Sequence, residues 1–315
     1  MSVIAVVGAG LIGRAWCISF VRGGHAVQVY DEMPGAAERA VAFAAEALPM
    51  LASEGLIDGG EMSAMTARLS VSASLEAALQ GAAHVQESTP ETLEIKRDVF
   101  ARLDKIAAPE TVLASSSSAI LPSLFTENLT GRQRALVVHP INPPYLIPAA
   151  EIVPAPWTDA AVVERTRALM VSCGQSPIVM KKELDGFVMN RMQGALLEEA
   201  FRLVADGYAS IEDVDIGIRE GLALRWSFMG PFETIDLNAP GGIRDYVERY
   251  QQIYERLHPS MQRRVDWAGP VLDQAENDRR KRLPAAKLRQ RQAWRDRRLM
   301  ALLAHKRKAD TEFGE

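Results

Sequence analysis

The sequence predicts an α/β protein in which a doubly wound parallel sheet, covered by helices, is followed by an all-helical domain. Three observations lead to this fold class. The first half of the chain alternates short apolar runs with stretches that carry apolar residues at helical spacing. Strand-like runs stop after Asp185–Gly186, and a chain of 315 residues is long enough for two domains. We therefore expect one domain over residues 1–185 and a second over residues 186–315.

The first domain is predicted to contain eight strands and four helices. The expected strands are Val3–Val7, Ala26–Tyr30, Leu69–Val71, Ala83–Gln86, Thr111–Ala114, Arg134–Val138, Ala149–Val153 and Ser176–Met180. The helices expected between them are Leu11–Val21, Gly35–Glu54, Glu91–Lys105 and Ala160–Cys173.

The second domain is predicted to be helical throughout. Its first helix, Phe187–Ala205, is apolar on every side, so we expect it to be buried in its own domain or at a subunit interface. The other expected helices are Ile211–Gly221, Gly242–Leu257, Ser260–Ala268 and Ala286–Lys306.

The composition is that of an ordinary globular protein, with 48% hydrophobic and 24% charged residues. No apolar run approaches the roughly 20 residues of a membrane helix, which predicts a soluble, cytoplasmic protein without a membrane partner. The two cysteines, Cys17 and Cys173, lack a CxxC spacing and are expected to be buried thiols. No metal site is predicted.

Positive charge is concentrated near the C-terminus. Residues 279–308 hold thirteen Lys or Arg and a single acid, Asp296, although the whole chain has a net charge of -4. Such a run can bind nucleic acid. Because Trp294–Met300 has an amphipathic pattern, we favour a helix that docks on the protein and expect no nucleic-acid partner.

A glycine-rich motif, Gly8-Ala9-Gly10-Leu11-Ile12-Gly13, follows the first predicted strand and begins the first helix. In a Rossmann-type domain, Gly8 allows the tight turn, Gly10 lets backbone approach the pyrophosphate, and Gly13 lets the helix pack closely on the sheet. The second strand ends at Asp31, where a carboxylate accepts hydrogen bonds from the adenosine ribose. Glu32 follows rather than an arginine, which favours NAD over NADP.

A candidate catalytic pair lies in the following strands. Among five histidines, only His139 ends a buried strand and enters a rigid polar loop, 140–144. Glu151 lies twelve residues later in an apolar strand, where an unpaired carboxylate is costly. A carboxylate partner would orient the imidazole while it accepts a hydroxyl proton. The alternative is a structural histidine and a glutamate at a strand end.

Two further polar features have open interpretations. The run Ser115–Ser118 follows another strand end, where hydroxyls can bind the reacting oxygen or cap the next helix. Asn190, in the apolar helix at the domain junction, is either a satisfied core amide or a donor that projects into the cleft.

These residues together resemble the 3-hydroxyacyl-CoA dehydrogenase superfamily, and within it the lambda-crystallin branch of L-gulonate 3-dehydrogenases. The superfamily pattern is carried by Val7–Gly13, Glu87–Glu91, Ala114–Ser118, His139–Pro144, Glu151 and Gly186–Arg191. The branch pattern is carried by Glu220–Leu222, Gly230–Thr234, Leu237–Ala239 and Arg291–Asp296. The resemblance spans both domains.

The resemblance implies a catalytic set. His139 is expected to be the general base during oxidation, with Glu151 as its orienting partner. Ser118 and Asn190 are expected to hold the substrate oxygen.

The resemblance also implies contacts with the cofactor and the oligomeric state. Glu91 and Lys96 are expected near the nicotinamide ribose, and a homodimer is expected through the second domain.

The expected substrate is a small hydroxy acid, L-gulonate, oxidised at its 3-hydroxyl. Ile141 and the unbroken serine run depart from the usual acyl-CoA pattern, and Arg225 is the candidate cation for the substrate carboxylate. Oxidation of an L-3-hydroxyacyl-CoA is the alternative, although the stretch 40–66, a plausible cover for the cleft, holds no Lys or Arg for CoA phosphates. A non-catalytic, crystallin-like structural role is the remaining alternative.

Overall fold

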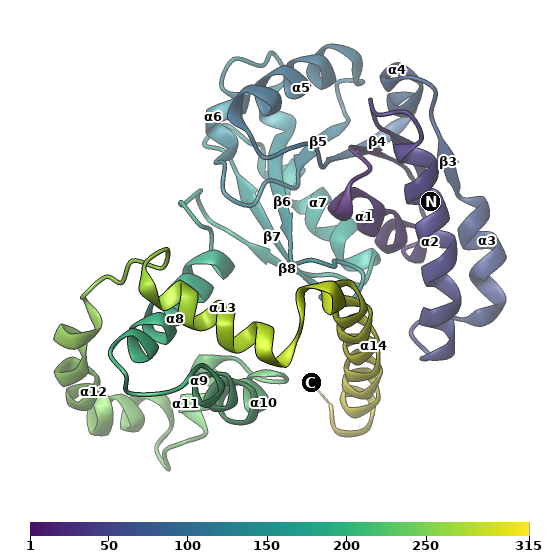
Figure 1. Cartoon of the computed structure of the whole chain (residues 1–315). Coiled ribbons are helices and arrows are strands. Elements are labelled where there is room, and N and C mark those ends of the chain that lie inside the picture. The colour runs from purple at the N-terminus through teal and green to yellow at the C-terminus, as the bar shows by residue number, and fades with distance from the viewer. Residues whose placement is uncertain (315) are drawn as a thin grey trace. The chain divides into compact units, whose positions relative to one another are not determined.

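The computed structural model describes residues 1–314, which form two compact units (Figure 1). The first unit comprises residues 1–188 together with the chain from residue 295 onward, and the second comprises Met189–Trp294. None of the helices in this described part combines the length and the apolar composition that crossing a bilayer requires.

The first unit is built on one eight-stranded sheet with the order β3-β2-β1-β4-β5-β6-β7-β8. Every predicted strand is confirmed: the first three have the predicted ends, and the ends of the other five differ by at most two residues. The strands are β1 (Val3–Val7), β2 (Ala26–Tyr30), β3 (Leu69–Val71), β4 (Ala82–Glu87), β5 (Val112–Ser115), β6 (Ala135–Pro140), β7 (Ala149–Pro154) and β8 (Ser176–Val179). The chain reverses its winding direction between β1 and β4, and this is the switch point where open α/β sheets bind ligands.

The prediction of a fully parallel sheet was wrong for the last two strands. β7 pairs antiparallel with β6, whereas β8 is parallel to β7. The loop 141–148 is too short for a parallel crossover, which needs a dozen or more residues. The hairpin places His139 directly opposite Glu151.

Helices cover both faces of the sheet and bury two apolar clusters. The four predicted helices correspond to α1 (Leu11–Arg22), α2 (Ala36–Ser53), α5 (Leu93–Ile106) and α7 (Ala160–Ser172). Three helices were not predicted, because five or six residues are too few to display a helical period: α3 (Met62–Ala67), α4 (Leu75–Leu79) and α6 (Pro122–Thr126). Both cysteines are buried and free, as expected.

The second unit is helical, as predicted. It contains α8 (Met189–Ala205), α9 (Ile211–Ile216), a π-helical segment η3 (Gly217–Leu222), α10 (Ala223–Trp226), α11 (Pro231–Asp236), α12 (Gly242–Met261) and α13 (Pro270–Arg282). The predicted burial of the first helix on all sides is not found within the chain. Only Arg202 and Val204 of α8 are buried, while Met192, Leu196 and Leu197 are exposed.

The predicted helix Ser260–Ala268 was wrong, and α13 was missed. The α12 helix continues to Met261, and the chain then unwinds. The Arg202 guanidinium donates to the carbonyl of Arg263 at 2.8 Å, and the amide of Val265 donates to a carboxylate oxygen of Glu198 at 2.9 Å. These tertiary bonds engage backbone groups that a helix would use internally. The α13 helix begins at Pro270, a residue favoured at the first helical position.

The last helix, α14 (Leu288–Phe313), departs from the expected domain division. The sequence assigned residues 186–315 to one domain, but residues from 295 onward group with the first unit. Met300 is buried in the core of that unit, with Leu299 and Leu303 packed against it. This part of the basic segment is therefore a docking helix.

Candidate active site

The glycine loop between β1 and α1 has the geometry that a pyrophosphate requires. Gly8 has a φ of 93°, a backbone conformation that residues with a Cβ rarely adopt. A Cβ on Gly13 would lie 1.8 Å from the carbonyl oxygen of Gly8, so the helix can begin this close to β1 only with glycine. A Cβ on Gly10 would meet nothing within 4 Å. The space in front of Gly10 and the first amides of α1 is thus open to an anion.

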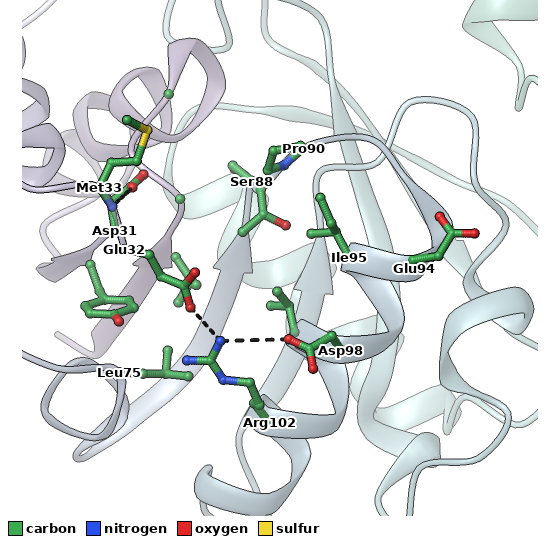
Figure 2. Close-up of a pocket in the computed structure, with 16 residues that line it drawn as sticks. Asp31, Glu32, Met33, Leu75, Ser88, Pro90, Glu94, Ile95, Asp98 and Arg102 are labelled. Atoms are coloured by element: carbon green, nitrogen blue, oxygen red, sulfur yellow. Dashed lines mark hydrogen bonds and ion pairs between the residues drawn. The ribbon is translucent and has the colours of Figure 1, made fainter.

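A cavity of about 750 Å³ extends from this loop across the ends of β1, β2 and β4 (Figure 2). Asp31 lies at its edge, where one carboxylate oxygen accepts from the amide of Ala9 at 2.6 Å and the other from the amide of Met33 at 2.8 Å. The carboxylate is therefore held in place beside the glycine loop. Glycines, helix amides and acid together fit the phosphates and adenosine ribose of a dinucleotide.

A cation that the sequence analysis missed also lines this cavity. Arg102 of α5 donates to Glu32 at 2.5 Å and lies 3.9 Å from Asp98 (Figure 2). No arginine follows Glu32 in the sequence, but Arg102, seventy residues away along the chain, lies beside it in the fold. A cation is thus present beside the adenosine end of the cavity, and the Glu32 carboxylate neutralises it.

Lys96 is the centre of a buried network below the loop after β4. Its ammonium donates to both oxygens of Glu87, at 2.8 and 3.0 Å, and to the carbonyl of Thr89 at 3.0 Å. The Glu87 carboxylate also accepts from the hydroxyl of Ser115 at 2.6 Å. This network stiffens the carboxyl ends of β4 and β5. A direct contact of Lys96 with the nicotinamide ribose stays a prediction.

Glu91 organises the serine run at the end of β5. One carboxylate oxygen accepts from the Ser117 hydroxyl at 2.6 Å and from the amides of Ser118 and Ala119 at 2.9 and 3.1 Å. Ser117 also accepts from the amide of Ile120 in the turn before α6, but no side chain caps α6 itself, so the predicted helix-capping role is not found. Ser115 and Ser117 are buried, and Ser118 is exposed. Ser117 therefore stabilises the turn, and Ser118 has the more exposed position.

His139 and Glu151 form a buried pair. The Nδ1 atom of His139 lies 2.7 Å from a carboxylate oxygen of Glu151, and the two side chains are 6% and 0% exposed. With Nδ1–H donating to the carboxylate, the Nε2 lone pair is left to accept a proton. The structure thus brings together the two residues that the sequence suggested as a pair.

Two residues that follow Gly186 complete this environment, and the sequence analysis did not assign either a physical role. Phe187 has a φ of 49°, unusual for a bulky side chain, and its buried ring centroid lies 5.5 Å from that of His139. The next amide, of Val188, donates to the second carboxylate oxygen of Glu151 at 2.6 Å. Both oxygens of Glu151 are therefore bound, and its orientation is set.

The two other candidate residues belong to the second unit. Asn190 is half-buried in the first turn of α8, two residues after Val188. Arg225 lies in α10, directly after the π-helical segment η3. Its Nε atom is buried and has no hydrogen-bond partner among residues 1–314. Over the same residues, no cluster of three His, Cys, Asp or Glu side chains is arranged to hold a metal ion.

Comparisons with known proteins cover both units. Residues 3–184 match the model of the 3-hydroxyacyl-CoA dehydrogenase NAD binding domain, and residues 186–273 match that of the C-terminal domain of the same family. Lambda-crystallin of Oryctolagus cuniculus is 39% identical over 307 residues, covering 96% of each chain. L-carnitine dehydrogenase of Streptomyces coelicolor is 40% identical over 248 residues, 78% of this chain and 77% of the relative.

A solved structure resembles the whole chain. It is that of 5-formyl-3-hydroxy-2-methylpyridine 4-carboxylic acid 5-dehydrogenase, described as an NAD⁺-dependent dismutase, and it covers 100% of both chains with a TM-score of 0.82 and 28% identity. The cofactor is therefore NAD, which the glycine loop and Asp31 fit. The chain belongs to the 3-hydroxyacyl-CoA dehydrogenase family of NAD-dependent enzymes that oxidise CH–OH groups.

Proposed function

We propose that this enzyme oxidises the 3-hydroxyl of a small β-hydroxy carboxylate, L-gulonate, to the 3-keto acid. The observation that carries the proposal is the buried His139–Glu151 pair, with an Nδ1 to carboxylate distance of 2.7 Å. A pair so oriented is a general base for a hydroxyl group.

The chemistry divides between the cofactor and the chain. When bound, NAD accepts the hydride that leaves C3 of the substrate. His139 removes the hydroxyl proton at Nε2, and Glu151 holds the ring in the required tautomer and stabilises the imidazolium that forms. Ser118 and Asn190 are proposed to hold the reacting oxygen. Glu91 supports Ser118 by accepting a hydrogen bond from its backbone amide at 2.9 Å.

Arg225 is proposed to bind the substrate carboxylate. The buried Nε atom without a protein partner is a donor that a carboxylate would satisfy, and an unsatisfied buried donor is otherwise unfavourable. The adjacent π-helical segment supports this assignment, because π-helical turns occur frequently at functional sites.

The named substrates of two relatives favour a free acid over a thioester. L-Carnitine carries a hydroxyl β to a free carboxylate, and the pyridine substrate of the structural relative is also a carboxylic acid. The family name gives the alternative, an L-3-hydroxyacyl-CoA. The stretch 40–66, which spans most of α2, has no Lys or Arg for CoA phosphates.

NADH formation at 340 nm tests the substrate with purified protein and NAD. We expect turnover of L-gulonate and none of L-3-hydroxybutyryl-CoA, with L-carnitine as a third arm. Turnover of the CoA ester alone would replace the proposal with the acyl-CoA alternative. NAD binding without turnover of any β-hydroxy acid would support a non-catalytic role.

Substitution of the catalytic pair tests the mechanism. We expect His139→Gln to lower kcat by about 10²–10⁴-fold, the contribution typical of a placed base, while NAD affinity is unchanged. Glu151→Gln should also lower kcat strongly, because an amide cannot stabilise the imidazolium. Near-normal turnover of either variant would contradict the assignment. NAD binding, followed by thermal shift, serves as the control for folding.

The division of labour between the domains is also a proposal. We infer that residues 1–185 bind NAD and that the second unit, Met189–Trp294, supplies substrate contacts and a homodimer interface. Exposed apolar side chains on α12 support the dimer; they are Ile243, Val247, Tyr250, Ile253, Tyr254, Leu257 and Met261.

A further inference from the structure

A second cavity, of about 200 Å³, lies within the first unit, where the end of α1 meets α14. We call it the tail cavity. Its polar lining includes Arg22, Tyr145, Ser176, Lys306, Arg307 and Asp310. The dinucleotide cavity shares none of these residues, so the tail cavity is a separate feature of the molecule.

The tail cavity carries more positive than negative charge. Three cations line it, Arg22, Lys306 and Arg307, against the single carboxylate of Asp310. Among residues 1–314, none of these cations forms an ion pair with a carboxylate within 4.0 Å.

The two arginines are anchored by neutral carbonyl groups instead. Arg22 donates to the carbonyl of Cys173 at 2.7 Å and to that of Tyr145 at 3.0 Å. Arg307 donates to the carbonyl of Leu56 at 2.8 Å. These bonds fix the position of each guanidinium but leave its charge uncompensated.

The positive charges of Arg22 and Arg307 repel each other. Burial, followed by the nearby charge of Arg307, lowers the pKa of Arg22 to about 10. An anion in the cavity would oppose this lowering of the Arg22 pKa, because its negative charge stabilises both guanidinium groups and the Lys306 ammonium.

We propose that the tail cavity binds a phosphate group, either as free phosphate or as a small phosphomonoester. Arginine forks match phosphate oxygens bidentately, and lysine supplies a mobile point charge. A dianion suits an excess of two positive charges. Bound phosphate would bridge α14 to α1 and thereby hold the C-terminal helix on the first unit, which gives Lys306 and Arg307 of the basic segment a function.

Thermal unfolding with inorganic phosphate as the probe tests this site. The assay uses the full chain with saturating NAD, so that the pyrophosphate site is blocked, and sodium chloride keeps the ionic strength constant. We expect phosphate to raise the Tm of the wild-type protein. Lys306→Gln should weaken the apparent phosphate affinity by about tenfold, and Lys306→Gln combined with Arg307→Gln should abolish the response.

Lys308→Gln is the matched control, since Lys308 is exposed on the same helix and does not line the tail cavity. It should respond as the wild type does. Within residues 1–314, Lys306 makes no side-chain hydrogen bond that anchors the helix, so its single variant should fold even if the double variant does not. Equal phosphate responses in wild type and Lys306→Gln would overturn the proposal. A stronger response to glycerol 3-phosphate than to phosphate would identify the ligand as a phosphomonoester.

Discussion

At the residue scale, the choice between the two nicotinamide cofactors depends on an arginine that is distant in sequence. Asp31 is held beside the glycine loop, and Glu32 is occupied by Arg102 at 2.5 Å. The carboxylates of Asp31, Glu32 and Asp98 thus line the same cavity as the guanidinium of Arg102. NADP is disfavoured because its 2′-phosphate would meet the carboxylates, while the arginine that could receive it is neutralised.

Removing the Glu32 carboxylate should therefore relax cofactor specificity. We expect Glu32→Gln to raise kcat/KM for NADP by about tenfold, since it deletes one like charge and frees Arg102 for the 2′-phosphate. The measurement is the ratio of kcat/KM for NADP and NAD. Adding Arg102→Gln should remove the gain, whereas Asp98→Asn alone should leave the ratio near its wild-type value. If the double variant keeps the gain, Arg102 is not the receptor.

His84 makes the stability of the folded protein depend on pH in the acid range. Burial lowers the pKa of His84 in β4 to about 4, against an ordinary value of about 6.5. The unfolded chain thus takes up a proton at higher pH than the folded chain, so stability is fully present above about 6.5 and falls until about pH 4.

The difference between the His84 pKa of the folded and unfolded states should cost about 2 kcal/mol of unfolding free energy as the pH falls from 6.5 to 5. Urea unfolding at several pH values measures it. We expect His84→Leu to lose less stability on acidification than the wild type, and parallel curves for the two proteins would refute this account.

At the scale of elements, the βαβ start of the chain separates stability from cofactor binding. Gly13 allows α1 to pack against the turn at Gly8, whereas Gly10 faces open space. The two glycines therefore have different tasks. Gly13 serves helix–strand packing, and Gly10 serves the approach of backbone to the pyrophosphate.

Alanine at these two glycines should give opposite phenotypes. Gly13→Ala places a methyl 1.8 Å from a backbone oxygen, so we expect a loss of about 1–3 kcal/mol of stability, measured by urea unfolding. Gly10→Ala should keep wild-type stability and lose NAD affinity, measured by titration calorimetry. Equal stability losses in both variants would show that the loop, rather than the ligand, requires glycine at position 10.

At the scale of the whole molecule, the helical unit leaves apolar surface uncovered. No residue of α12 is buried, although apolar side chains recur along it at intervals of three and four residues. A helix with this pattern normally packs against a partner, and the homodimer proposed above would supply one.

A charge placed in this apolar face should dissociate the dimer. We expect wild-type protein to scatter light as two chains and Val247→Glu to scatter as one, because the glutamate would be desolvated at the interface. Gln252→Glu adds the same charge on the polar face of α12 and should remain dimeric. A wild-type mass near that of one chain would exclude the dimer.

Local patterns determined most of the fold of this protein. Strands, long helices and the glycine loop follow from apolar periodicity and from backbone demands on single residues, which are local properties of the chain. The short helices do not, because five or six residues are too few to display a helical period. The unwound segment after α12 does not either, because distant residues, Arg202 and Glu198, bind its backbone.

Some residues of the site could be predicted from local sequence, and others only from the tertiary structure. Asp31 and the glycines could be assigned from position alone, and the His139–Glu151 pair could be suggested from two strand ends. Only the tertiary structure decided that these strands are antiparallel, which puts the pair in register, and that Arg102, Phe187 and Val188 complete the surroundings. The physical reason is that charge pairing and side-chain packing act through space, whereas sequence patterns report only on neighbours along the chain.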